Sequence, residues 1–94
     1  MIRLLADPLR ARIIELLADG PACTCHLVDD TGAKQPTVSH HLRALREAGA
    51  VVAEPRGRFT YYRLSPEPFE NAAAHLADLA KRVRANADAS RVCP

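Results

Sequence analysis

Two cysteines separated by a single residue, Cys23 and Cys25, have the side chains in this sequence that are best suited to chemistry. A thiolate is a nucleophile and a ligand for soft metals and metalloids. On a regular helix, residues i and i+2 point about 200° apart, so both sulfurs can reach one ion only where the helix start is irregular. Pro21 makes such a start natural, and the helix dipole would favour thiolates there. We therefore expect a two-thiol chelate at the start of a short helix.

The cysteine count and the composition indicate the compartment. Three cysteines are an odd number in 94 residues, and the sequence begins without the basic region, apolar core and cleavage site of a secretion signal. It also lacks the roughly 18 consecutive apolar residues of a membrane span. We therefore expect a cytoplasmic protein with no membrane partner, and free, functional thiols rather than a structural disulfide framework.

The elements that must position these thiols can be read from helical spacing and from turn residues. Hydrophobic residues make up 48% of the chain, enough for one small domain over residues 1–94. The pattern predicts a helix from Pro8 to about Ala18, a short helix from Leu27 to about Thr31, a polar-faced helix at about 35–48, a β-hairpin at about 50–64 and a long helix at about 66–88. This order predicts a mainly α fold with a small β-hairpin, the winged helix-turn-helix.

Basic and hydrogen-bonding side chains are concentrated on the third helix and the hairpin. Net charge is only +2, but residues 34–63 hold six basic and two acidic residues. In a winged helix-turn-helix the third helix enters the major groove of DNA while the hairpin grips the adjacent backbone or minor groove. We expect double-stranded DNA as the partner, contacted by Gln35, Thr37, Ser39, His40 and Arg43 from the helix and by Arg56 and Arg58 from the hairpin.

One alternative applies to this polar helix. Its outer face could be merely solvated, with the domain serving protein contacts instead. His41 differs from its neighbours, because it lies beside the apolar residues Val38, Leu42 and Leu45, where a partly buried structural histidine is the expected role.

Four segments of the chain together resemble the ArsR/SmtB family of metalloregulatory repressors: Ala6-Asp7-Pro8-Leu9-Arg10, Cys23-Thr24-Cys25-His26-Leu27, Gln35-Pro36-Thr37-Val38-Ser39-His40-His41-Leu42 and Gly57-Arg58-Phe59-Thr60-Tyr61-Tyr62-Arg63-Leu64. The resemblance covers nearly the whole chain. It implies a homodimer that releases operator DNA when a metal or metalloid binds. The last helix, whose apolar stripe runs from Phe69 to Ala87, would then be the dimerisation helix.

The resemblance implies trivalent arsenic or antimony as the inducer. Such ions prefer three thiolates, and arsenic-responsive members often have a third cysteine where this chain has Val28. Cys93 is the remaining thiol, and it could complete the set from a flexible tail or from the partner subunit. The predicted metal ligands are therefore Cys23, Cys25 and Cys93.

Other readings use the same residues. Cadmium, lead or zinc could be held with help from His26, Asp29 or Asp30, although His26 directly follows Cys25 and is expected to be awkward as a co-ligand. A lone His75 does not indicate a second metal site on the last helix. The thiols could instead sense oxidants or reactive sulfur by forming a bridge between Cys93 and Cys23 or Cys25. The chain has no phosphate loop, paired carboxylates or Ser-His-Asp set, so we do not expect an enzyme.

Overall fold

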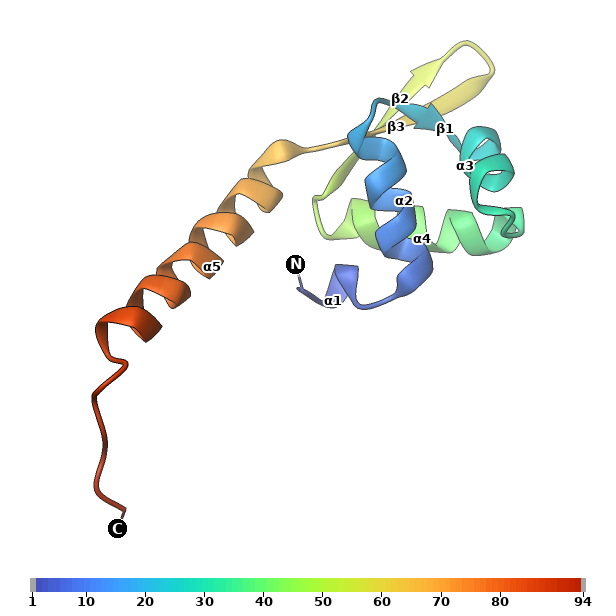
Figure 1. The fold of residues 1–94 in the computed structure, drawn as a ribbon. Helices are drawn as coiled ribbons and strands as arrows, with labels where there is room; N and C mark the ends of the chain where they lie inside the picture. Colours follow the sequence, from blue (N-terminus) through green and yellow to red (C-terminus); the bar gives the residue numbers. More distant parts are fainter. Residues whose placement is uncertain (1, 94) are drawn as a thin grey trace.

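The computed structural model of this chain describes residues 2–93 (Figure 1). In chain order the elements are α1 (Ile2–Leu5), α2 (Pro8–Ala18), β1 (Ala22–Cys23), α3 (Thr24–Thr31), α4 (Gln35–Glu47), β2 (Val51–Arg56), β3 (Phe59–Leu64) and α5 (Pro66–Ala85). The predicted fold class, mainly α with a β-hairpin in a winged helix-turn-helix, is confirmed. No helix among the described residues is both long enough and apolar enough to cross a bilayer.

The core lies where α2, α3 and α4 meet. Ile13 and Leu27 are fully buried there, and α4 contributes Val38, Leu42 and Leu45 from a single face. These three α4 residues are spaced at i, i+4 and i+7, which places them on one stripe of a helix. The opposite face of α4 is consequently left in solvent.

Local sequence signals set the ends of the helices. Asp7 caps α2 by accepting a hydrogen bond from the Arg10 backbone N–H at 3.0 Å, and Pro8 follows at the first helical position. Gly32 ends α3 with a φ of 71°, a left-handed conformation that favours glycine. The short turn after it sets the angle between α3 and α4.

The hairpin is part of a three-stranded antiparallel sheet in the order β1-β3-β2. Its edge strand β1 pairs Ala22 with Tyr62 and Cys23 with Tyr61. The sequence analysis did not anticipate this strand and began the following helix three residues too late, at Leu27 instead of Thr24. The pairing ties the first cysteine directly to the hairpin.

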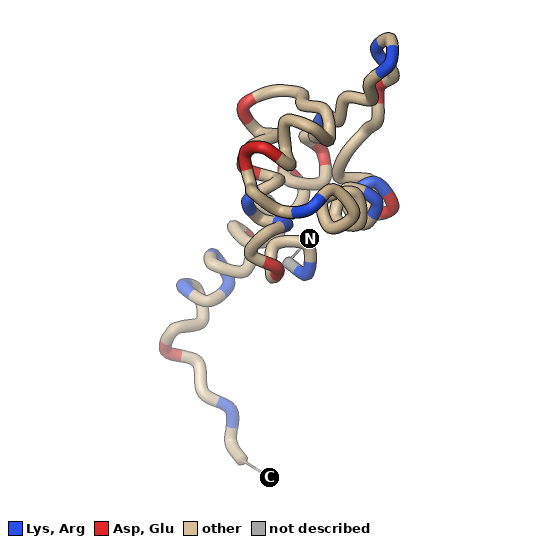
Figure 2. Tube along the Cα trace, turned by 90° about the vertical axis from the view of Figure 1, so that its right-hand side faces the viewer, with Lys and Arg blue, Asp and Glu red and all other residues tan. Residues whose placement is uncertain are grey.

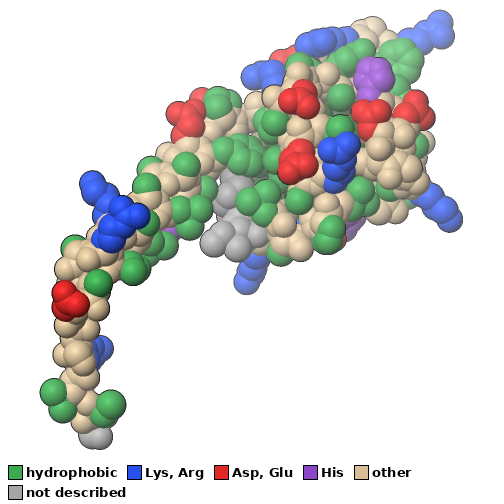
Figure 3. Space-filling model, viewed as in Figure 1, with side chains coloured by type: hydrophobic (Ala, Val, Ile, Leu, Met, Phe, Trp, Pro, Cys, Tyr) green, Lys and Arg blue, Asp and Glu red, His purple; other side chains and the backbone are tan. Residues whose placement is uncertain are grey.

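The last helix, α5, leads away from the rest of the molecule (Figure 1) and buries none of its residues within the described chain. Hydrophobic side chains run along it in the space-filling view (Figure 3), and Leu76 and Val83 are 51% and 71% exposed. The helix ends at Ala85 rather than near residue 88, and a non-helical tail follows. This apolar face is therefore open in a single copy of the chain.

The buried stripe of α4 yields a stability prediction. Leu42→Ala removes a side chain that is 1% exposed, so we expect the free energy of unfolding in urea to fall by about 2–5 kcal/mol. Val52→Ala, at a position 40% exposed in β2, is the control and should cost far less. Equal losses for the two variants would contradict this description of the core.

Candidate thiol site and nucleic-acid interface

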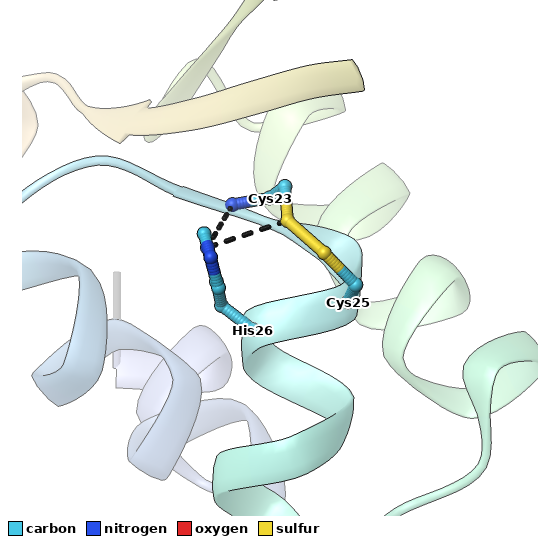
Figure 4. Close-up of side chains that lie close together, drawn as sticks. All are labelled: Cys23, Cys25 and His26. Carbon is cyan, nitrogen blue, oxygen red and sulfur yellow. Dashed lines mark hydrogen bonds between the residues drawn. A yellow bond between two sulfur atoms is a disulfide. The ribbon is translucent and has the colours of Figure 1, made fainter. Parts of the chain in front are cut away.

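The two sulfurs of Cys23 and Cys25 come together because Cys23 is not helical. It ends β1 and serves as the N-cap of α3, with φ −86° and ψ 166°, while Cys25 sits in the first turn of that helix. The extended backbone turns the Cys23 side chain toward Cys25 (Figure 4). The irregular helix start required for a shared ligand is present.

The structure joins Cys23 and Cys25 in a disulfide, with their Cα atoms 5.4 Å apart. This corrects the expectation that both would be free thiols. It also corrects the pairing in the redox reading, which placed the bridge between one of them and Cys93. A bond can form between residues i and i+2 here because extended backbone at the N-cap brings both side chains to one side.

His26 belongs to the same cluster. Its Nδ1 lies 3.3 Å from Cys23 Sγ and accepts a hydrogen bond from the Cys23 backbone N–H at 3.2 Å. The two sulfurs and this nitrogen lie within 4.8 Å of one another. The expectation that His26 would be awkward beside Cys25 was wrong, because Nδ1 turns back toward the N-cap, as in a capping box. Two sulfurs and an imidazole are ligands suited to a soft ion.

The cluster is partly open to solvent. Cys23 is 3% exposed, whereas Cys25 and His26 are exposed. A hollow of about 330 Å³ adjoins the two cysteines, and its other lining residues are Thr24, Val28, Asp29, Gln35 and Phe59. A small ligand can thus reach the sulfurs from a side bordered by the start of α4 and by the hairpin.

Cys93, the third cysteine, is free and exposed. It belongs to the tail beyond α5. This tail ends far from α3 and from the β2–β3 hairpin, which we call the wing (Figure 1). Within one copy of the chain the structure does not bring it to Cys23 and Cys25. Its role as a third ligand stays a prediction.

The predicted DNA contacts on α4 share one exposed surface. Gln35, Thr37, Ser39, His40 and Arg43 are all exposed. His40 and Arg43 lie opposite the buried stripe, and the other three flank them toward its edges. Arg46, which was not among the predicted contacts, lines a small hollow together with Ser39 and Arg43. Its spacing of three residues from Arg43 could have revealed it, because positions i and i+3 are neighbours on a helix.

The wing arginines differ in their surroundings. Arg58 lies in the turn between the strands, exposed, whereas Arg56 Nη2 is 3.2 Å from Glu54 Oε2 and its guanidinium lies over the Tyr61 ring. The hydrogen bond from Arg63 at 2.9 Å, followed by that from Arg56, lowers the pKa of Glu54. Figure 2 shows basic residues gathered at the hairpin tip and along α4.

His41 is buried, at 6% exposed, which confirms the structural role expected for it. Its Nδ1 accepts a hydrogen bond from Arg10 Nε at 3.2 Å, and its Nε2 lies 3.8 Å from Asp7 Oδ1. Burial lowers the pKa of His41, and Asp7 opposes this while Arg10 and His40 add to it. The His41 side chain thus links α4 to the start of α2.

Comparison with known proteins supplies the family. The family model for bacterial regulatory proteins of the arsR family matches residues 7–52. The arsenic resistance transcriptional regulator ArsR1 of Pseudomonas putida is 43% identical over 68 residues, which are 71% of this chain and 53% of that protein. Across three such curated relatives, the chain spans 53% to 64% of their length.

Solved structures of similar fold cover more of this chain than the curated relatives do. A possible transcriptional regulator for arsenical resistance superposes with a TM-score of 0.74 at 34% identity, covering 95% of both chains. A homodimeric winged helix-turn-helix DNA-binding domain from Mycobacterium bovis, solved by NMR, gives a TM-score of 0.67 at 32% identity and covers 84% of this chain and 73% of that one. These relatives are regulators of transcription, in agreement with the expectation that the chain is not an enzyme.

The buried His41 predicts a pH dependence of stability. Its pKa in the folded protein lies below the ordinary 6.5, so the unfolded chain takes up a proton more readily, and stability falls as the pH drops from about 6.5 through the folded pKa. His41→Asn keeps an acceptor for Arg10 without titrating. We expect a flatter unfolding free energy between about pH 7 and 5 in this variant, measured by urea denaturation.

Asp7 does not obscure the measurement, since its pKa is lowered from 3.8 and it titrates below this window. Val52→Ala, which removes no titratable group at an exposed position of β2, is the control and should keep the wild-type slope. A wild-type slope in His41→Asn would refute the assignment.

Proposed function

This chain belongs to the ArsR family of bacterial regulatory proteins, and we propose that it is a homodimeric repressor that leaves its operator when trivalent arsenic or antimony binds its thiols. The observation that carries this proposal is the convergence of Cys23 and Cys25 at the start of α3. That helix packs against α4 through Leu27. An inducer held there acts on the neighbour of the DNA-reading helix, and the site of action is the cytoplasm, where the operator lies.

For DNA, the exposed face of α4 enters the major groove with Gln35, Thr37, Ser39, His40 and Arg43. Arg43 is long enough to read a guanine or to reach a phosphate. Arg58 at the hairpin tip and Arg56 behind it contact the adjacent backbone. The support for this surface is its uniform exposure and its basic charge.

For dimerisation, the open face of α5 is the proposed contact. A groove of about 600 Å³ between α1 and α5 includes Leu5, Phe69 and Leu76 in its lining. Exposed leucines and valines on one helix favour burial against a second copy, and the M. bovis relative is homodimeric. A two-fold dimer presents two α4 helices to half-sites about one DNA turn apart.

For the inducer, the reduced form of the site is the active one. The Cys23–Cys25 disulfide must open before the two thiolates can bind a trivalent ion. Two sulfurs leave one position of a trigonal arsenic unfilled, and Cys93 from the tail of the partner subunit is the proposed third ligand. The protein with the ion bound to its cysteines then favours a dimer whose α4 helices no longer match both half-sites. A coupling free energy of about 1–3 kcal/mol between ion binding and operator binding is enough for release.

A second candidate function rests on the disulfide itself. Since Cys23 and Cys25 can bond to each other within one chain, the same switch could respond to oxidants or reactive sulfur. The bridged and the reduced forms would then be the two states that differ in operator affinity. Cadmium, lead or zinc on Cys23, Cys25 and His26 is a variant of the first proposal.

The inducer proposal predicts a loss of response in Cys23→Ser and Cys25→Ser. Both reduced variants should bind operator DNA like the wild type, yet neither should release it with arsenite, because one thiolate cannot chelate the ion. Fluorescence anisotropy measures release and ultraviolet thiolate-to-arsenic absorption measures binding. Cys93→Ser should weaken arsenite binding only.

Normal release by either serine variant would refute the site. An unchanged Cys93→Ser would remove the third ligand alone. Release of the wild type by an oxidant such as diamide, with no response to arsenite, would favour the redox function instead.

The DNA surface predicts losses at Arg43 and Ser39. If Arg43 contacts a base, Arg43→Ala should weaken operator binding by about 1–3 kcal/mol. If Arg43 contacts a phosphate, the variant should instead lower the salt dependence of the logarithm of affinity by about one. Ser39→Ala should weaken binding less. Arg84→Ala, on exposed α5, is the control for lost charge. Wild-type affinity and slope in Arg43→Ala would exclude it from the interface.

A further inference from the structure

The ring of Tyr61 lies between the thiol site and the wing. Tyr61 sits on β3 opposite Cys23 in the antiparallel register. Its ring meets the imidazole of His26 edge-on, with ring centroids 5.9 Å apart and an interplanar angle of 68°. The guanidinium carbon of Arg56 lies 4.6 Å from the centroid of the same ring. One side chain therefore contacts both a residue of the cysteine cluster and a predicted DNA contact.

The direction of Arg56 depends on this ring. The other partner of Arg56 is Glu54 at 3.2 Å, and Glu54 is shared with Arg63 at 2.9 Å. Arg56 and Glu54 are both solvent-accessible, and such exposed ion pairs hold a long side chain weakly. A cation above an aromatic face adds an attraction with a defined direction. Without the ring, the Arg56 side chain would be held by the exposed ion pair with Glu54 alone.

The direction of the Tyr61 contact depends in turn on Cys23. His26 is held by the Cys23 backbone N–H and lies 3.3 Å from Cys23 Sγ. In the structure this sulfur is bonded to Cys25, and replacing that disulfide by thiols or by a bound ion alters the charge and the position of the atom that His26 faces. The imidazole must adjust, and the next group in contact with it is the ring of Tyr61.

We propose that Tyr61 is a positioning residue that couples the state of the Cys23–Cys25 site to the grip of the wing on DNA. In the structure this set of contacts accompanies the Cys23–Cys25 disulfide. When two thiols or a bound ion replace the bridge, His26 moves, the Tyr61 ring follows, and the orientation of Arg56 toward the DNA backbone changes. Release then occurs at the wing as well as at α4. The inference rests on the proposed function, which supplies the inducer and the DNA.

The test uses the full-length reduced protein and three variants. Tyr61→Leu removes the ring, Tyr61→Phe keeps it, and Arg56→Ala removes the group that the ring orients. Thr60→Leu, the adjacent exposed residue on the opposite face of β3, is the control. Two quantities are measured: the salt slope of operator binding, and the ratio of operator affinities without and with arsenite.

In Tyr61→Leu we expect the wild-type stoichiometry of arsenite binding. The slope of the logarithm of operator affinity against the logarithm of salt concentration should be smaller by about one, the effect of one lost phosphate contact. The ratio of operator affinities without and with arsenite should be severalfold smaller. Tyr61→Phe and Thr60→Leu should match the wild type. Combining Tyr61→Leu with Arg56→Ala should add nothing to Arg56→Ala alone, because the two act in series. A merely structural role of Tyr61 would lower the melting temperature without changing the affinity ratio.

The inference is overturned if folded Tyr61→Leu keeps the wild-type slope and ratio. Should this variant fail to fold, Arg56→Ala is used in its place. An unchanged affinity ratio in Arg56→Ala would also overturn the inference. If the wild type ignores arsenite, the proposed arsenic response fails on its own. The same ratio is then taken between the dithiol and disulfide forms, and the role of Tyr61 is tested there.

Discussion

The structure depends most on the extended backbone of Cys23, which is at once the last residue of a strand and the first cap of a helix. As a strand residue it pairs with Tyr61, so the thiol site is tied to the wing by the backbone. As an N-cap it turns its sulfur toward Cys25 and offers its N–H to His26. Were Cys23 helical, the two sulfurs would point to different sides and the site would not exist.

Around this point the fold separates two tasks. The stripe of Val38, Leu42 and Leu45 fixes α4 against α2 and α3, so the polar face of α4 is presented rigidly. In the wing, by contrast, the side chain of Arg56 is held by a partly exposed ion pair with Glu54 and by the ring of Tyr61. A rigid DNA-reading helix beside a weakly held wing side chain suits a regulator whose affinity for DNA must change without unfolding of its core.

Sequence reasoning succeeded where a periodic or capping signal was present. The spacing in α4 and the proline after Asp7 gave α4 and α2 nearly to the residue, and Pro66 gave the start of α5 but not its end. It failed at β1, because two residues carry no periodicity and their partner lies almost forty positions later in the chain. His26 was expected to be an awkward co-ligand because it directly follows Cys25, and its turn back toward the N-cap was not foreseen. The contacts of Tyr61 with His26 and Arg56 depend on the sheet register, which the sequence does not show.

The pairing of β1 with β3 also limits how this protein can vary in length. Successive side chains of a strand point to opposite faces, so one residue inserted between Ala22 and Cys23 would turn the first sulfur away from the second if Ala22 kept its partner. The number of residues in β1 is therefore fixed by the sheet. The tail beyond Ala85 makes no such pairing within the described chain, and there insertions and deletions leave the geometry of the thiol pair untouched. Variation in length among close relatives in this fold is thus expected to accumulate at the carboxyl end, with the two residues of β1 held constant.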